Sequence, residues 1–260
     1  MSVTIVVTTF NRHELVSRAI RSAIKWVDQI GCDIVVVDDG SSDNSIDRLR
    51  QQFADEISQG RLTCIRHSRN MGVTAAKNTG FEHARGDWVV FLDSDDLLIA
   101  EAAKPVQRAL SESGRNPIVF FRCIDQDGRF VGRPFEDTQV LSLARYGRDS
   151  SYGEVLVAIN KVLVEKPPFD ADLRGYEGLG CARLIKRFGP ALLSPIVARC
   201  YHRIGRDRLS APRGFLARVH LLAIGHRRFV SLLGDALSPG RKRSLWIKSV
   251  LYAVVGKVYK

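Results

Sequence analysis

The first half of the chain alternates between short apolar runs and stretches with helical periodicity, and this alternation restricts the possible folds more than any other feature. The apolar runs are rich in β-branched residues and are apolar at nearly every position, as is typical of strands buried on both faces. We expect four such strands, at residues 3–9, 33–40, 61–67 and 87–93. Helical patterns separate them, at residues 14–27, 46–53 and 73–84. The pattern predicts an α/β fold with a mostly parallel sheet and helices on both faces.

The pattern weakens after a further strand candidate at residues 117–125. Residues 132–138 and 165–175 contain the Gly, Pro and Asp residues that are typical of loops and turns. Two helical stretches follow, at residues 214–234 and 241–259. We therefore place one boundary near residue 125 and a second near residue 210.

The cysteines indicate a reducing environment. The chain has five of them, at positions 32, 64, 123, 181 and 200, with no CxxC pair and no His/Cys cluster at zinc spacing. The first residues, "MSVTIVVTTFNR", are too short and too weakly charged for a secretory leader and read as a strand. We expect a cytoplasmic protein without a structural metal site.

The positive charge lies in the C-terminal part of the chain. The net charge is +11, but residues 1–198 carry 25 Lys and Arg against 26 Asp and Glu, whereas residues 199–260 carry 14 against 2. Within residues 241–260 there are six Lys and Arg and no acid, and apolar residues recur there at helical spacing: Ile247, Val250, Leu251, Val254 and Val258. No run reaches the about 20 apolar residues needed to cross a bilayer.

Such a basic amphipathic helix favours contact with an anionic membrane surface. The alternative is that these helices pack on the rest of the protein or dimerise. No nucleic-acid-binding motif accompanies the charge, so we expect no nucleic acid partner.

Polar clusters follow three of the expected strands at the point where each ends. They are Thr8-Thr9-Phe10-Asn11, Asp38-Asp39-Gly40-Ser41 and Asp93-Ser94-Asp95-Asp96. Any one of them alone could cap a helix, and we assign that role to Asp96, before a helix expected to begin near Leu97. Because ligands bind at the carboxyl ends of parallel strands, the three clusters together predict a ligand site.

The third cluster indicates a metal. Neighbouring carboxylates suit Mg²⁺ or Mn²⁺, which bind through one or two carboxylates and substrate phosphates. The chain has no Walker A loop and no GxGxxG turn, which argues against an ATPase and against a dinucleotide-binding protein.

Four motifs, in this order, give the chain a resemblance to the inverting family-2 glycosyltransferases of the GT-A fold, of the kind found in bacterial polysaccharide synthesis. They are "VVTTFNR", "VVVDDGSSDNS", "NMGVTAAKNTGFEHARGDWVVFLDSDD" and "LRGYEGLG". The likeness is strong over residues 3–125 and weak over 150–210. It implies a GT-A domain at 1–210, with a nucleotide-sugar-binding half at 1–125 and an acceptor-side half at 126–210. Residues 211–260 would form a basic, amphipathic, helical extension.

The resemblance also implies roles for single residues. Thr8 and Asp39 would hold the nucleotide base, and Asp93 would lie near the ribose and the metal. Asp95 would ligate the Mn²⁺ or Mg²⁺ that bridges the diphosphate. The segment that lines the nucleotide pocket would contain Asn70, Gly72 and Lys77, although Lys77 could instead lie on an exposed helix face.

The catalytic base is expected in "GYEGLGCARLIKRFG". The family usually has Glu-Asp before a helix containing Arg-Leu, and here Tyr176-Glu177 precedes Arg183-Leu184. We assign the base to Glu177, with Asp170 and Asp172 as alternatives; Glu177 could also be a surface residue that opens a helix.

Farther along, basic side chains could close over the diphosphate or form a solvated loop. They are His202, Arg203 and Arg206.

The predicted function is metal-dependent, inverting transfer of a sugar from a nucleotide sugar, with a UDP-sugar as the expected donor. The acceptor would be a hydroxyl of a glycan or lipid-linked glycan in surface polysaccharide synthesis, at the inner face of the cell membrane. Two alternatives remain. A non-catalytic relative would explain the altered residue 176, and a nucleotidyltransferase would require a Gly-rich phosphate loop that residues 8–14 do not provide.

Overall fold

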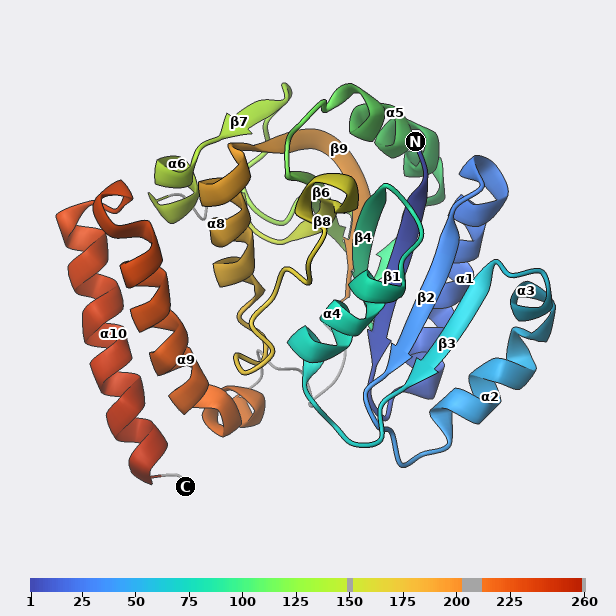
Figure 1. Ribbon diagram of the computed structural model, residues 1–260, viewed down its shortest axis with the longest axis horizontal. Coiled ribbons are helices and arrows are strands. Elements are labelled where there is room, and N and C mark those ends of the chain that lie inside the picture. The colour runs from blue at the N-terminus through green and yellow to red at the C-terminus, as the bar shows by residue number, and fades with distance from the viewer. Residues whose placement is uncertain (149–151, 203–211, 259–260) are drawn as a thin grey trace.

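The computed structural model describes residues 1–148, 152–202 and 212–258 (Figure 1). A nine-stranded sheet forms the centre of the protein, with the strand order β3-β2-β1-β4-β8-β6-β9-β5 and with β7 paired to β9. Helices cover both faces of the sheet, and two long helices form one end of the molecule, at the left of Figure 1. This arrangement confirms the predicted α/β fold with flanking helices.

The four strands predicted first form the parallel part of the sheet. They are β1 (Val3–Thr9), β2 (Asp33–Asp38), β3 (Leu62–Arg66) and β4 (Trp88–Asp93). In register, Thr8 lies opposite Val37 on one side and Asp93 on the other. The polar residues that follow β1, β2 and β4 therefore meet at one edge of the sheet.

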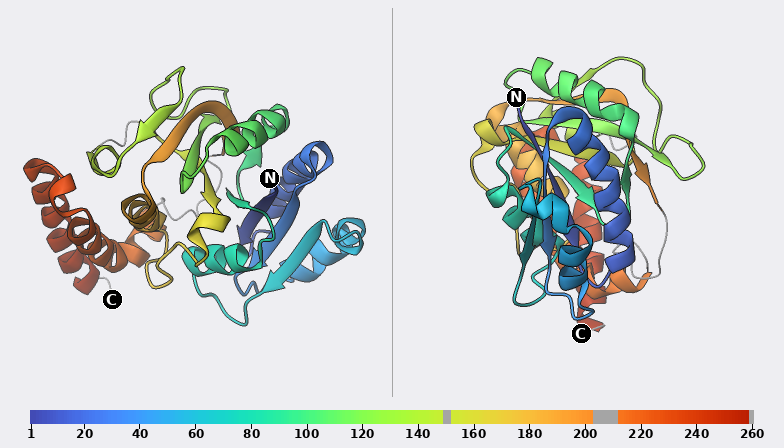
Figure 2. Two further views of the ribbon diagram at one scale, coloured as in Figure 1. Left: turned by 45° about the horizontal axis from the view of Figure 1, so that its top comes forward. Right: turned by 90° about the vertical axis from the view of Figure 1, so that its right-hand side faces the viewer.

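Successive residues of these strands enter two different cores. Ile5 and Val7 pack with α1 (His13–Ile30) and α5 (Ala103–Glu112) on one face. Val6 packs with α4 (Val73–His83) on the other, and Figure 2 shows the two helix layers on either side of the sheet. Burial on both faces explains why these strands are apolar at almost every position.

Helix α4 lies unusually close to the sheet. A Cβ atom at Gly80 would lie 2.2 Å from Cγ1 of Val6, so only glycine fits between helix and strand. This close approach fixes the height of α4 above β1, and with it the position of Lys77 one turn earlier in the helix.

The remaining strands are mostly antiparallel. β8 (Val155–Asn160) lies between β4 and β6 (Ile118–Asp125) and runs antiparallel to both. β9 (Ala191–Tyr201) runs parallel to β6 and antiparallel to β5 (Leu97–Leu98) and β7 (Gln139–Leu141). The segments before and after residue 125 thus share one sheet. The division into the halves 1–125 and 126–210 stays a prediction.

Short helices complete the domain, together with α8 (Glu177–Phe188), which packs beside β6. The short helices are α2 (Ser45–Gln52), α3 (Ala54–Ser58), η1 (Ala100–Ala102), α6 (Leu143–Arg148) and α7 (Lys161–Val164).

The capping role predicted for Asp96 is wrong. Leu97 and Leu98 belong to strand β5, and the next helical turn, η1, begins only at Ala100. Asp96 is buried instead, where it accepts the His202 N–H and lies 3.0 Å from the guanidinium of Arg199. Leu97 and Leu98 pair with Cys200 and Arg199 of β9 instead of starting a helix, and this pairing brings Asp96 beside the arginine.

The C-terminal helices α9 (Pro212–Leu233) and α10 (Pro239–Val258) form a hairpin through the turn η2 (Gly234–Ala236). Figure 1 shows α9 between α8 and α10. A small apolar core joins the hairpin to α8, and it contains Ala182, Leu233, Leu237 and Leu245. These helices therefore pack on the domain, as one of the two expectations had it.

The outer side of α10 is apolar and exposed. We call this side the apolar strip; it consists of Trp246, Ile247, Val250, Leu251 and Val254, each at least 42% exposed. Within the described ranges, none of the helices has the length and apolar character required to span a bilayer.

Candidate active site

A cavity of about 550 Å³ opens at the carboxyl ends of β1, β2 and β4. Four parts of the chain contribute polar side chains to it: the strand ends, α4, the segment that leads into α8, and α9. These side chains include Thr8, Asp39, Lys77, Asp93, Asp95, Arg174, Glu177 and Arg218. The cavity thus collects the predicted base and both predicted metal ligands.

Lys77 links the two sides of this cavity. Its Nζ lies 3.0 Å from Oδ1 of Asp93 and 3.0 Å from Oε1 of Glu177. Burial alone would lower the pKa of Lys77, but the two carboxylates raise it above its ordinary value, so the ammonium stays charged. The side chain is buried, so the alternative of an exposed helix face is wrong.

Each aspartate that follows β4 has a cationic neighbour. Arg12 Nη1 lies 3.4 Å from Oδ2 of Asp95, and Arg199 lies 3.0 Å from Asp96 and 3.9 Å from Asp93. Burial alone would raise the pKa of Asp93, but Lys77 and Arg199 bring it below its usual value. Burial raises the pKa of Asp96 to about 7, although Arg199 acts in the opposite direction.

The sequence did not single out Arg12 or Arg199. Arg12 directly follows the polar cluster at the end of β1, and that position was a usable signal. Arg199 lies in β9, a strand that the sequence pattern did not predict, and its partner Asp96 is 103 positions away. No local pattern could have identified this pair.

The donor atoms fit a hard divalent cation. Asp93 and Asp95 both line the cavity with carboxylate oxygens. Among residues 1–148, 152–202 and 212–258, no group of three or more His, Cys, Asp or Glu side chains converges as a ready-made metal site. Mg²⁺ and Mn²⁺ commonly use one or two carboxylates and complete their shell with substrate phosphates and water, so two aspartates suffice.

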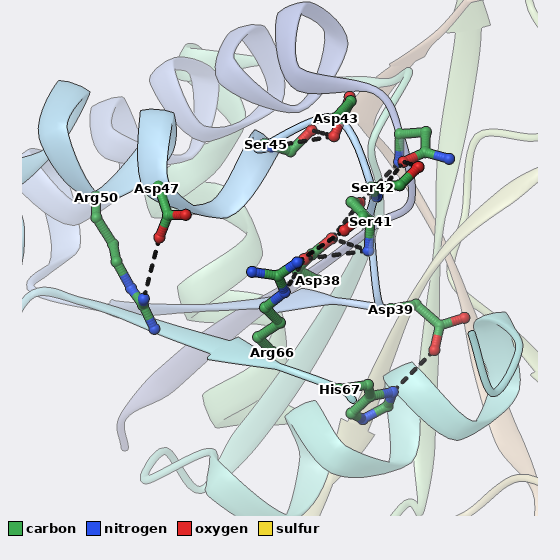
Figure 3. Close-up of polar contacts among 11 residues, drawn as sticks. Asp38, Asp39, Ser41, Ser42, Asp43, Ser45, Asp47, Arg50, Arg66 and His67 are labelled. Carbon is green, nitrogen blue, oxygen red and sulfur yellow. Dashed lines mark hydrogen bonds and ion pairs between the residues drawn. The ribbon is translucent and has the colours of Figure 1, made fainter. Parts of the chain in front are cut away.

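Asp39 also lines the cavity, and hydrogen bonds fix both of its oxygens. Oδ1 accepts the Met71 N–H at 2.8 Å and Oδ2 accepts the Gly72 N–H at 2.7 Å. The imidazole of His67, which the sequence did not identify, lies 2.8 Å from Oδ1 (Figure 3). Gly72 has a φ of +96°, which disfavours other residues at this tight approach.

Other predicted site residues lie beside the cavity and not among its lining residues. Asn70 and Gly72 precede the lining residue Val73. His202 is buried and binds Asp96 through its backbone N–H, at 3.0 Å. Arg203 and Arg206 fall outside the described residues.

The alternative bases are engaged elsewhere. Asp170 pairs with Arg183 at 2.8 Å, and Asp172 pairs with Arg228 of α9 at 2.7 Å. Neither aspartate lines the cavity, whereas Glu177 does, as the first residue of α8. Of the three candidates for the base, Glu177 is thus the one that lines this cavity.

The residue before Glu177 has a structural task. A Cβ atom at Gly225 of α9 would lie 2.8 Å from the ring of Tyr176, so the ring packs flat against this glycine. The ring also lies 5.6 Å from that of His226. Tyr176, where the family usually has Glu, therefore joins the C-terminal hairpin to the segment that carries Glu177.

The bridge made by Lys77 leads to a prediction. Lys77→Met keeps most of the length of the unbranched side chain but leaves two neighbouring carboxylates without their shared cation. We expect the free energy of unfolding to fall by about 1–3 kcal/mol, as measured by urea denaturation. Lys25→Met, on the exposed side of α1, is the matched control. Equal stability of the two variants would contradict a structural role for the bridge.

Comparisons with known proteins found a matching family and similar chains. The model of the family "Glycosyl transferase family 2" matches residues 4–159. A relative from Campylobacter jejuni, GalNAc(5)-diNAcBac-PP-undecaprenol beta-1,3-glucosyltransferase, is 26% identical over 270 residues, covering 98% of this chain and 84% of the relative.

Two solved structures share the fold. Staphylococcus aureus TarS 1–349 in complex with UDP has a TM-score of 0.67 at 16% identity, with 100% of this chain and 91% of that chain covered. Mannosyltransferase PcManGT from Pyrobaculum calidifontis, in complex with GDP-Man and Mn²⁺, has a TM-score of 0.61 at 18% identity, with 99% and 73% covered. The family match extends over more than half of the residues, from β1 to β8, and so the chain belongs to glycosyl transferase family 2 and is a glycosyltransferase.

Proposed function

We propose that this glycosyltransferase is metal-dependent and inverting, and that it moves a sugar from a UDP-sugar to a hydroxyl of a glycan or lipid-linked glycan. The observation that carries this proposal is the position of Glu177 in one cavity with Asp93 and Asp95. The carboxylate of Glu177 can face the acceptor while those of Asp93 and Asp95 face the donor. A site with this separation of roles suits direct displacement at the anomeric carbon.

The donor would lie along the carboxyl ends of the parallel strands. Thr8 and Asp39 would hold the base, beside the segment of Asn70, Gly72 and Lys77. The fixed orientation of Asp39 supports this role, because a carboxylate held by two backbone N–H groups costs little to preorganise. TarS, which shares the fold, has been solved with UDP.

Asp93 and Asp95 would hold Mg²⁺ or Mn²⁺. A divalent cation held there would neutralise negative charge that grows on a departing diphosphate. Arg12 and Lys77 orient the two aspartates, and their positive charges add to the attraction for phosphate. A mannosyltransferase of the same fold has been solved with GDP-Man and Mn²⁺, which supports the assignment.

Glu177 would accept the proton of the acceptor hydroxyl. Its Oε1 lies 3.0 Å from Nζ of Lys77, and this contact holds the carboxylate in the cavity. Attack from the side of Glu177, opposite the departing diphosphate, inverts the configuration of the anomeric carbon.

The acceptor would be carried by a lipid in the synthesis of a surface polysaccharide. The Campylobacter relative is named for a PP-undecaprenol acceptor. The apolar strip of α10 is exposed, and basic residues of the same helix, such as Lys242 and Lys248, lie near its margins. We propose that this side of the hairpin rests on the anionic inner face of the cell membrane.

The role of Glu177 is tested by Glu177→Gln. We expect the donor to bind as in the wild type, measured by calorimetry, and kcat for transfer to fall by about 10²–10⁴-fold, because the amide cannot accept the proton. Glu101→Gln, an exposed residue of η1, is the control. Normal turnover of the Glu177→Gln variant would show that Glu177 is not the catalytic base.

The role of Asp95 is tested by Asp95→Ala. We expect loss of Mn²⁺-dependent turnover with little change in melting temperature, because this side chain contributes mainly a metal ligand at the edge of the cavity. Titration of Mn²⁺ against activity makes the measurement, and Asp55→Ala, an exposed aspartate of α3, is the control. Full activity with an unchanged Mn²⁺ requirement would show that the metal lies elsewhere.

Membrane contact is tested at the apolar strip. The double substitution Leu251→Glu with Val254→Glu adds charge where apolar side chains should enter the membrane, and we expect at least tenfold weaker co-sedimentation with phosphatidylglycerol vesicles. The matched control is Val162→Glu, an exposed valine of α7. Unchanged vesicle binding by the double variant would contradict the proposed membrane contact of the apolar strip.

A further inference from the structure

Two arginines in the cavity have no acidic partner among the described residues. Arg174 lies in the segment that leads to α8, and Arg218 lies in α9. The other cations that line the cavity differ, since Lys77 pairs with Asp93 and Glu177, and Arg12 pairs with Asp95. Arg174 and Arg218 therefore add positive charge to the cavity without a direct ion pair among the described residues, although the charge of Glu177 also acts on Arg218.

Their hydrogen-bonding capacity is also only partly used. Nη1 of Arg218 donates to the Gly175 carbonyl at 2.9 Å, which holds the guanidinium against the residue next to Arg174. The Nε atoms of both arginines are buried, and neither has a hydrogen-bond partner within the described residues. A buried N–H group without an acceptor costs free energy, so an incoming acceptor group gains by pairing with it.

The two guanidinium groups also act on each other. Burial lowers the pKa of Arg218, and the charge of Arg174 lowers it further, while Glu177 raises it. An anion between the two arginines would relieve this repulsion. Arginine pairs bind phosphate well, because each planar guanidinium can donate two parallel hydrogen bonds to its oxygens.

We propose that Arg174 and Arg218 bind a phosphate group of the acceptor, which would be a sugar phosphate or diphosphate carried by a lipid. This inference rests on the proposed function, since it assigns the two sides of one cavity to donor and acceptor. Arg174 lies three positions before Glu177, and Arg218 donates to the carbonyl of Gly175, two positions before Glu177. The arginine pair is therefore assigned to the side of the proposed base, and the aliphatic part of Arg174 also packs against Gly72.

The origin of Arg218 supports the same assignment. It comes from α9, and α9 packs against α10, which carries the exposed apolar strip. One hairpin would then contact the membrane with its outer helix and the phosphate of a membrane-bound acceptor with its inner helix. A phosphate so placed lies close to Glu177, so the reacting sugar would be attached directly to it.

The test measures binding of octyl diphosphate, a soluble lipid diphosphate without a sugar, by calorimetry. The full-length protein is first saturated with UDP and Mg²⁺ to fill the donor site. We expect octyl diphosphate to bind the UDP-saturated wild type, and to bind Arg174→Ala and Arg218→Ala at least tenfold more weakly, because each change removes a charge-assisted contact. Arg227→Ala, an exposed arginine of α9, should bind it as the wild type does.

A second titration, with UDP alone, distinguishes the two possible sources of phosphate. Equal UDP affinity in the wild type and both variants supports the acceptor assignment. Weaker UDP binding in the variants, with octyl diphosphate binding unchanged, would assign the pair to the donor and overturn the inference. Failure of octyl diphosphate to bind the UDP-saturated wild type would overturn it as well, even if a variant did not fold. Failure of any nucleotide diphosphate to bind the wild type would instead contradict the proposed function.

Discussion

The arrangement of the cavity depends on the two ion pairs that the ammonium of Lys77 makes. This ammonium is held between Asp93, at the end of a central strand, and Glu177, at the start of a helix that follows 84 positions later. Carboxylates that close together would repel each other in a partly buried site. A shared cation makes their proximity stable, so that groups with opposite roles can stand in one cavity. The tight packing of α4 at Gly80 fixes the place from which that cation reaches out.

The C-terminal hairpin is part of the site and not only an attachment to it. Three contacts join α9 to the segment around Glu177: Arg218 with Gly175, Arg228 with Asp172, and Gly225 with Tyr176. The basic character of this part of the chain therefore has two sources. Some arginines neutralise aspartates of the catalytic segment or face the cavity, and others remain on the surface beside the apolar strip.

The sequence predicted the parallel half of the fold well because burial on both faces leaves a strong local pattern. Thr8, Asp39, Asp93 and Asp95 could be predicted to lie together for the same reason, since parallel strands bring their carboxyl ends to one edge. The antiparallel strands were harder to predict from the sequence. β9 carries Ser194, Pro195 and Arg199 among its apolar residues, and its pairing with β6 includes register shifts.

The partners of the acidic residues could not be predicted from the sequence for a similar reason. Asp96 pairs with a residue of β9, and Asp39 contacts His67 on a neighbouring strand end. A local pattern showed which carboxylates gather at the sheet edge, but it could not show which cations would meet them. The helix expected after Asp96 did not form because Leu97 and Leu98 pair with the distant strand β9.

The flat contact between Tyr176 and Gly225 limits how this enzyme can be recombined with others. A hairpin transplanted from a transferase that has glutamate at the position of Tyr176 would bring a helix that fits a smaller, charged neighbour. The ring of Tyr176 would then lose its packing partner, and the segment bearing Glu177 would lose one of its contacts with the hairpin. Chimeras that aim to change acceptor preference should therefore exchange the catalytic loop and the C-terminal helices together, as one unit.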